Sequence, residues 1–179
     1  MKIKTISPIS THYKEVKRLY ESSFPVQERI SWPWLVLMSL FGQADFLAYF
    51  DEGVFAGFSY SLKSHNMYYL LFLAVPSEHH SKGYGHQILK EMAKRAGKRP
   101  IFLVIEPLDE AADNYPLRLK RLAFYEKNGY HLTDYIYYEN EEMYQVLTNR
   151  ISADIKDFEH LAKRIELSGM KIRVEQIKK

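Results

Sequence analysis

The stretch from Met67 to Gly97 limits the fold of this 179-residue chain more than any other. It opens with nine largely apolar residues, Met67–Val75, which are too few to span a membrane as a helix and indicate a buried strand. A polar loop follows, and beyond it apolar residues recur at helical spacing up to Gly97, a typical helix stop. Another apolar run, Ile101–Ile105, predicts a second buried strand. The whole stretch therefore predicts two parallel strands joined by a right-handed helical crossover.

The loop between this strand and helix carries two glycines, Gly83 and Gly85. Glycine permits unusual dihedral angles and a close approach of the backbone to a ligand. The first amides of a helix are free donors in a position where the helix dipole favours an anion. We therefore expect a phosphate group at the amides of Gly83, Tyr84, Gly85 and His86, with the positive charge of Lys82 beside it. A Gly-x-Gly pair is weak evidence by itself, and a tight turn without a ligand is the alternative interpretation.

The loop does not fit two common phosphate-binding patterns. It lacks the Gly-Lys-Ser/Thr ending of a P-loop, and Ile88 stands where a dinucleotide fingerprint has its third glycine. It resembles instead the coenzyme A loop of the GNAT superfamily of N-acetyltransferases, where Gln/Arg-x-x-Gly-x-Gly/Ala follows a Leu-x-Val-x-Pro-like strand end. The matching residues are Leu73, Ala74, Val75 and Pro76, followed by His80, Ser81, Lys82, Gly83, Tyr84 and Gly85. The resemblance implies that residues 73–86 bind coenzyme A, although His80 replaces the usual Gln or Arg.

Composition narrows the classes of function. The net charge is only +3, with both signs mixed along the chain, which argues against nucleic acid as a partner. There is no cysteine, so no protein thiolate takes part in the chemistry. The N-terminus lacks the apolar core of a signal peptide and no apolar run reaches membrane length, so we expect a cytoplasmic protein without a membrane partner.

The order of elements predicts a mixed α/β fold. We expect a mostly antiparallel sheet flanked by helices, in the order strand, two helices, hairpin, strand–helix–strand, helix, hairpin. This is the GNAT order, and it predicts an acetyltransferase domain over residues 1–150. Residues 151–179 form an extension, with an amphipathic helix expected over residues 152–168 and a strand over residues 170–174. We expect the extension to pack on the sheet of its own chain or on the partner in a homodimer.

Tyr125 is the first candidate catalytic residue. It lies in the segment Ala123–Tyr130, which resembles the GNAT segment where a tyrosine, three residues and Gly-Phe close the penultimate helix. In that family the tyrosine hydroxyl lies near the coenzyme A sulfur and protonates the departing thiolate, and the resemblance implies this role for Tyr125. The alternative is a core tyrosine with no chemical role. Arg118 and Arg121 replace the Asn and Ala common in the family, and either arginine could meet a phosphate or remain solvated.

The general base is harder to identify. The strand Met67–Val75 has no carboxylate, although some GNAT proteins carry a Glu there. Glu106, which follows the next strand, is our candidate, acting directly or through water; a surface acid at a strand end is an equal alternative. The histidines near the loop match no metal-ligand spacing, so we expect no metal.

These observations predict an N-acetyltransferase of bacterial type that uses acetyl-CoA as co-substrate. The resemblance implies direct transfer within a ternary complex to a primary amine, with a small amine first and a peptide or protein amine second. A non-catalytic coenzyme A-binding or regulatory module is the alternative, favoured by His80 and by the missing strand carboxylate. A third hypothesis, an unrelated nucleotide-phosphate binder, predicts binding of ATP or NAD.

Overall fold

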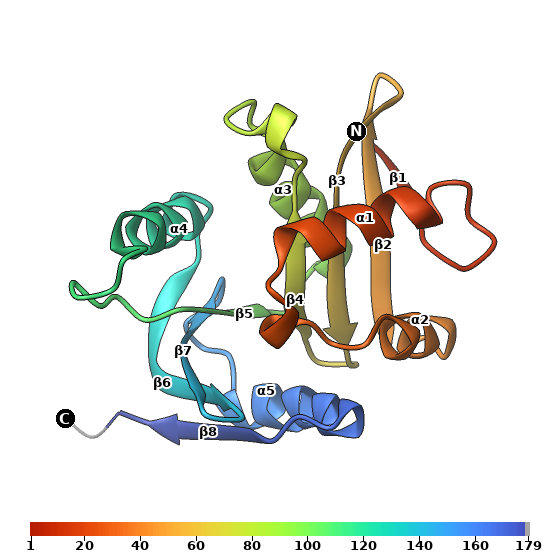
Figure 1. Cartoon of the computed structure of the whole chain (residues 1–179). Helices are drawn as coiled ribbons and strands as arrows, with labels where there is room; N and C mark the ends of the chain where they lie inside the picture. The colour runs from red at the N-terminus through yellow and green to blue at the C-terminus, as the bar shows by residue number, and fades with distance from the viewer. Residues whose placement is uncertain (178–179) are drawn as a thin grey trace. The chain divides into compact units, whose positions relative to one another are not determined.

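The computed structural model describes residues 1–177, and the chain forms two compact units (Figure 1). The first unit consists of residues 1–64 and 70–97, and the second of residues 65–69 and 98–177. Within residues 1–177, eight strands follow the order β1-β2-β3-β4-β5-β7-β6-β8. This mixed, mostly antiparallel sheet with flanking helices confirms the predicted fold class.

The strands of the first unit are built around a long hairpin. β2 (Ala44–Asp51) and β3 (Val54–Lys63) pair antiparallel, and β1 (Lys2–Thr5) pairs antiparallel with the other edge of β2. The turn between β2 and β3 needs two residues with positive φ, Glu52 and Gly53. β4 (Tyr68–Ala74) follows, with its first two residues in the second unit and the rest in the first.

Helices cover both faces of the first unit's sheet. α1 (Tyr13–Ser23) and α2 (Trp32–Leu40) pack on the face that carries Phe58, because Tyr20 of α1 lies 6.3 Å from the Phe58 ring and α2 contacts β2. α3 (Tyr84–Ala96) packs on the opposite face, where Ile88 approaches Gly57 of β3. Residues 57 and 58 point to opposite faces because successive strand residues alternate.

The segment between α1 and α2 contains a 3₁₀ turn, Val26–Glu28. Pro33 lies in the first turn of α2, where the missing N–H costs no helical hydrogen bond. Arg29 holds this segment, because its guanidinium donates to the main-chain carbonyls of Glu21 and, at 2.6 Å, of Phe24. These two bonds satisfy carbonyls that the end of α1 leaves open.

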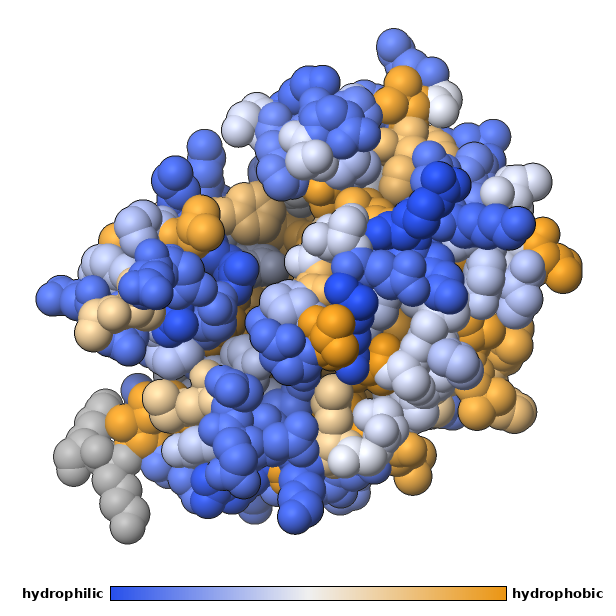
Figure 2. Space-filling view, in the orientation of Figure 1, coloured by the Kyte–Doolittle hydropathy of each residue, from blue (hydrophilic) through white to orange (hydrophobic). Residues whose placement is uncertain are grey.

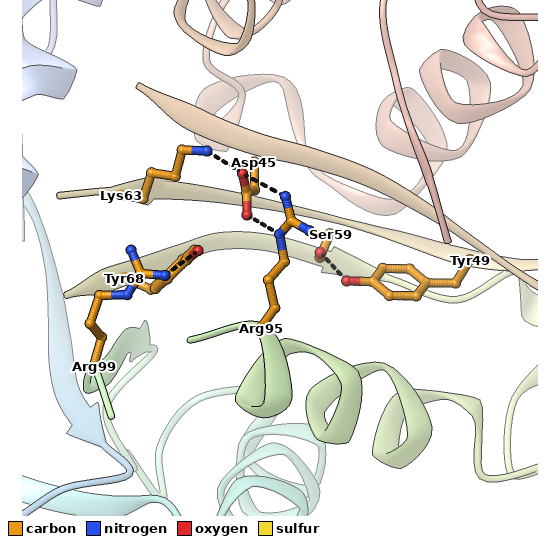
Figure 3. A network of polar contacts seen from close by, with 7 residues as sticks. All are labelled: Asp45, Tyr49, Ser59, Lys63, Tyr68, Arg95 and Arg99. Atoms are coloured by element: carbon orange, nitrogen blue, oxygen red, sulfur yellow. Dashed lines mark hydrogen bonds and ion pairs between the residues drawn. The ribbon is translucent and has the colours of Figure 1, made fainter. Parts of the chain in front are cut away.

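A buried ion-pair network joins α3 to the sheet of the first unit (Figure 3). Asp45 of β2, whose side chain is 6% exposed, receives Lys63 Nζ at 2.5 Å and the guanidinium of Arg95 from α3. Burial alone would raise the pKa of Asp45, but these two cations outweigh it and hold the pKa below its usual value. Nearby, the hydroxyls of Tyr49 and Ser59 lie 2.8 Å apart across β2 and β3.

The second unit combines four strands with two helices. β5 (Ile101–Ile105) pairs antiparallel with β7 (Glu142–Thr148), which pairs with β6 (His131–Glu139). α4 (Tyr115–Lys127) lies between β5 and β6 in the chain and contacts β5. Pro116 occupies the first turn of α4, and Gly129 follows the helix with a φ of 81°. The relative direction of β4 and β5, predicted to be parallel, stays a prediction.

The extension packs within the second unit. α5 (Ile155–Ala162) places Phe158, which is fully buried, against the rings of Phe102 and Tyr69, each 5.0 Å away. β8 (Ile172–Gln176) pairs antiparallel with β6. The single helix expected over residues 152–168 is wrong in its second half, which forms a 3₁₀ helix, Lys163–Ser168, that ends at Gly169. A domain boundary at residue 150 stays a prediction.

The surface is typical of a chain exposed to water. Figure 2 shows mostly hydrophilic residues on the visible face, with hydrophobic residues in small separate groups. No helix in the described part of the chain is both long enough and apolar enough to cross a bilayer.

Candidate functional site: a helix N-terminus and an aromatic helix end

The loop between β4 and α3 contains a 3₁₀ turn and a left-handed glycine directly before the helix. A 3₁₀ turn, Ser77–His79, is followed by two residues with positive φ, Ser81 at 63° and Gly83 at 82°. Gly83 is the residue that precedes α3, and the N–H of Gln87 donates to the Gly83 carbonyl at 3.1 Å as the first helical bond. The amides before Gln87 therefore lie outside the helical ladder, as expected for an anion site.

The two glycines of this loop differ in backbone conformation. Gly83 has the left-handed conformation that a side chain disfavours, and a Cβ placed there would meet no atom within 4 Å. Gly85 lies in the first turn of α3, and its φ is not positive. The unusual dihedral angle expected for Gly85 is therefore wrong, and the close approach of a ligand to Gly85 stays a prediction.

His80 acts within the loop. Its Nε2 lies 2.9 Å from the carbonyl oxygen of Val75, so the imidazole donates to the residue that follows β4. This bond closes the loop from the end of the strand to the turn before α3. The histidine at the position of the family's Gln or Arg thus supports the backbone of the predicted cradle.

Charges of both signs lie at the start of α3. Its first turn contains no acidic residue, and Lys82 is exposed just before it. Lys82 Nζ lies 3.2 Å from His79 Nδ1, and the His79 ring contacts the ring of Tyr84 at 5.7 Å. Partial loss of water and the nearby carboxylate of Asp51, the last residue of β2, raise the pKa of Tyr84.

The end of β4 supplies the other half of the predicted coenzyme A segment. Ala74, the last residue of the strand, is buried, whereas Leu73 and Val75 are half-buried. Together with residues 80–86 they belong to the first unit, so the structure brings the whole predicted coenzyme A segment into one compact unit.

Tyr125 belongs to the second unit, near the end of α4. Its ring contacts Phe124 at 5.1 Å and Tyr130 at 5.7 Å. Burial raises the pKa of Tyr125 to about 12, against a smaller opposing effect of the Arg121 charge. The hydroxyl of Tyr125 is therefore a proton donor over the whole physiological range.

Glu106 lies just after β5 and is held by three side chains. Arg121 donates to Oε2, Asn114 donates to Oε1 at 3.0 Å, and Arg118 Nε lies 3.8 Å from Oε1. Arg118 also donates to the Pro107 carbonyl at 2.8 Å. The two arginines that the sequence offered to a phosphate thus contact the candidate base, and Asn114 is a partner that sequence reasoning missed.

Gly57 is a second residue that sequence reasoning missed. It is a buried glycine in the interior of β3, a pattern that signals a close backbone approach. A Cβ on Gly57 would lie 2.3 Å from the carbonyl oxygen of Ala74. Among residues 1–177, no three His, Asp or Glu side chains gather in a way that could hold a metal ion.

Comparisons with known proteins identify the family. A family model described as acetyltransferase (GNAT) domain matches residues 42–132, just over half of the chain. No curated protein sequence matches. A structure from Bacteroides thetaiotaomicron, assigned to the GNAT family of acetyltransferases, superposes with a TM-score of 0.76 at 22% identity, covering 96% of this chain and all of the other.

Two ligand-bound structures show the same fold. An aminoglycoside 6'-N-acetyltransferase complexed with coenzyme A has a TM-score of 0.61 at 19% identity and covers 86% of this chain and all of its own. A GNAT acetyltransferase from Elizabethkingia anophelis with acetyl-CoA bound has a TM-score of 0.55 at 14% identity, covering 82% of this chain and 95% of its own. The sequence match and the shared fold agree with the loop, strand and helix described above: the chain belongs to the GNAT family of acetyltransferases.

Proposed function

We propose that this protein transfers an acetyl group from acetyl-CoA to a primary amine, with a small amine as the first candidate and a peptide or protein amine as the second. The observation that carries the proposal is the start of α3. There a left-handed Gly83, a first turn without acids and an exposed Lys82 form a site for the coenzyme A pyrophosphate. Membership in the GNAT family supports acetyl transfer as the reaction.

The reaction makes three chemical demands. The amine must lose a proton, the thioester carbonyl must be polarised, and the thiolate must be stabilised as it leaves. We assign polarisation of the carbonyl to a backbone amide at Ala74 or Val75, because the end of a strand offers a fixed donor. The amides of residues 83–86 bind the pyrophosphate and fix the position of the thioester along β4.

The pKa of Tyr125 refines its proposed role. At about 12 it lies above the value of an ordinary thiol, about 8.5. Complete transfer of the phenol proton to a thiolate is therefore uphill, whereas a hydrogen bond donated to the developing negative charge is not. We assign Tyr125 the role of this donor. The proton that finally reaches the sulfur comes from the nitrogen of the amine, which becomes acidic once it has attacked the carbonyl.

Glu106 remains the proposed base. A carboxylate has about four acceptor positions. Asn114 and Arg121 each donate to one of its oxygens, and Arg118 lies close to Oε1. A position therefore remains for a water that carries the amine proton. The same contacts fit a purely structural carboxylate that joins β5 to α4.

Two observations favour the alternative, a coenzyme A-binding module without turnover. His80 donates to Val75 instead of offering its side chain to a ligand, and Glu106 is already engaged by arginines. This alternative predicts that coenzyme A binds but that no amine is acetylated.

A panel of amines assayed for thiol release from acetyl-CoA decides between the two functions. The panel should include polyamines, aminoglycosides and peptides with a free N-terminus or lysine, and calorimetry should measure coenzyme A affinity in parallel. Turnover above the hydrolysis rate with one class of amine supports the proposal. Binding without turnover across the panel favours the module, and the absence of binding contradicts both.

A further inference from the structure

We propose that Gly57 is a positioning residue for acetyl-CoA, an inference that rests on the proposed function. Gly57 lies in the interior of β3, opposite Tyr49 of β2. The pairing shifts register immediately after this position, so a β-bulge interrupts the hairpin there. The φ of Gly57 is 145°, which side chains rarely adopt. This position therefore requires glycine for two reasons: its φ angle, and the closeness of Ala74 and Ile88.

The space that a side chain would need at Gly57 is already filled by the end of β4, which belongs to the predicted coenzyme A segment, and by a side chain of α3. A Cβ would lie 2.3 Å from the carbonyl oxygen of Ala74, the last residue of β4. The same Cβ would lie 3.2 Å from Cδ1 of Ile88, in the second turn of α3. Because Gly57 carries a hydrogen atom in place of a Cβ, β3 can lie this close to the end of β4 and to α3, whose start is the proposed anion site.

These two contacts differ in how easily they can adjust. The Ile88 methyl is the far end of a side chain, and a small rotation restores an ordinary distance. The Ala74 oxygen belongs to the backbone, and contacts of a Cβ below 3.0 Å essentially never occur. A methyl group on Gly57 therefore requires the backbone at Gly57 or at Ala74 to shift, and the two must separate by at least about 0.7 Å.

Displacement at Ala74 acts on the residues proposed to bind the thioester. Val75 follows directly, and its carbonyl accepts the hydrogen bond from His80 that closes the loop before α3. A misplacement of about 1 Å at a reacting centre costs up to about a hundredfold in rate. We therefore expect Gly57 to control the position of acetyl-CoA without contacting it.

The test compares Gly57→Ala with Gly42→Ala. Gly42 also has positive φ, 72°, but a Cβ there meets nothing within 4 Å, so this control adds backbone strain without a clash. Coenzyme A affinity by calorimetry, the KM for acetyl-CoA, kcat and the melting temperature are measured for both proteins. We expect Gly57→Ala to weaken coenzyme A binding at least about tenfold and to lower kcat by about ten- to a hundredfold. Gly42→Ala should change only the melting temperature.

A second variant separates the backbone contact from the side-chain contact. Ile88→Val removes Cδ1, so the double variant Gly57→Ala/Ile88→Val relieves the 3.2 Å contact and leaves the one at 2.3 Å. We expect the double variant to bind coenzyme A as weakly as Gly57→Ala, and Ile88→Val alone to bind it normally. Wild-type affinity in either folded Gly57 variant overturns the inference. If the wild-type protein itself binds no coenzyme A, the proposed function fails instead.

Discussion

At the scale of single residues, the proposed chemistry depends on the hydroxyl of Tyr125 and on the backbone conformation of Gly83. The hydroxyl of Tyr125 is neutral at physiological pH, as in any tyrosine, and burial raises its pKa further, to about 12. Gly83 keeps a left-handed backbone that positions the first amides of α3. One residue is proposed to act on the departing sulfur and the other on the phosphates, so substitutions at them should separate turnover from binding.

Replacing Tyr125 by Phe tests the first role. The substitution keeps the ring, which packs on Phe124 and Tyr130, and removes only the hydroxyl. We expect turnover to fall by about ten- to a thousandfold, with little change in coenzyme A affinity or melting temperature. Because the pKa is about 12, the ratio of wild-type to variant turnover should stay constant from about pH 7 to pH 10. A core tyrosine without a chemical role would instead lose stability and keep its turnover.

Replacing Gly83 by Val tests the second role, and Gly169→Val is its matched control. Both glycines have the left-handed conformation, with φ of 82° and 96°, and a Cβ added at either would meet no atom within 4 Å. Each substitution should cost about 1–2 kcal/mol of stability through strain. Only Gly83→Val should also weaken coenzyme A binding, by at least about tenfold, when measured by calorimetry on folded protein. Equal affinity in both variants would contradict the assignment of this loop.

At the scale of elements, α3 is anchored at both ends by different forces. Its N-terminal half carries the proposed anion site and packs Ile88 beside Gly57, whereas its C-terminal half is tied to the sheet by Arg95 and Asp45. The buried Asp45 is also contacted by Lys63 of β3. We therefore expect the position of the helix, and of the phosphate site proposed at its start, to depend on an ion pair at the far end of the same helix.

The substitution Asp45→Asn should show how much this ion pair contributes to the free energy of unfolding, and how that contribution changes with pH. The folded protein lowers the pKa of Asp45, so its contribution to stability is present above the unfolded pKa of about 3.9 and is lost as the pH falls through the folded value. We expect the variant to be about 1–3 kcal/mol less stable at pH 7, less than for a fully buried pair because Arg95 is half-exposed.

Urea unfolding at several pH values measures the effect. The difference between the wild type and Asp45→Asn should shrink below about pH 5, where the Asp45 carboxylate of the unfolded chain starts to take up protons while that of the folded protein stays charged. Substituting the exposed Glu159, which pairs with Lys163 on the surface, provides a control with an expected cost of at most about 1 kcal/mol. A pH-independent difference at Asp45 would mean that its charge does not stabilise the fold.

At the scale of the whole molecule, residues 151–177 complete the second unit. α5 packs Phe158 against Phe102 of β5 and Tyr137 of β6, and β8 pairs with β6 in a register that joins Tyr137 to Val174. Without β8, the main-chain N–H and C=O groups on that edge of β6 would have no strand to pair with. The segment after residue 150 therefore belongs to the same compact unit as α4 and Tyr125.

Removal of the residues after Arg150 should unfold or aggregate the protein. The single substitution Phe158→Ala tests the same packing with a smaller loss of stability. Phe158 is fully buried, so its truncation to Ala should cost about 3–5 kcal/mol in urea unfolding. Leu167→Ala, at a side chain that is 76% exposed, should cost little. Size-exclusion chromatography should accompany both measurements. Unchanged stability after removal of residues 151–179 would show that the extension is a passive tail.

Much of the fold follows from the sequence because its signals are local. The period of two in strands, the helical spacing of Ile88, Leu89 and Met92, and the glycines at helix ends all concern residues that are neighbours in the chain. The sequence predicted the hairpins, α3, α4 and the helix N-terminus at Gly83 on these grounds. It missed the 3₁₀ half of the extension, because apolar spacing is similar in the two kinds of helix over two turns.

The sequence by itself determined the order of elements and the glycine-containing start of α3, since backbone propensity and hydrophobic period are properties of short segments. Only the tertiary structure decided which distant groups meet. It paired His80 with Val75, Glu106 with Arg121, and Gly57 with the carbonyl of Ala74. These contacts depend on strand register and on the packing of helices on sheets, and a shift of one residue in a strand would turn its side chains to the opposite face.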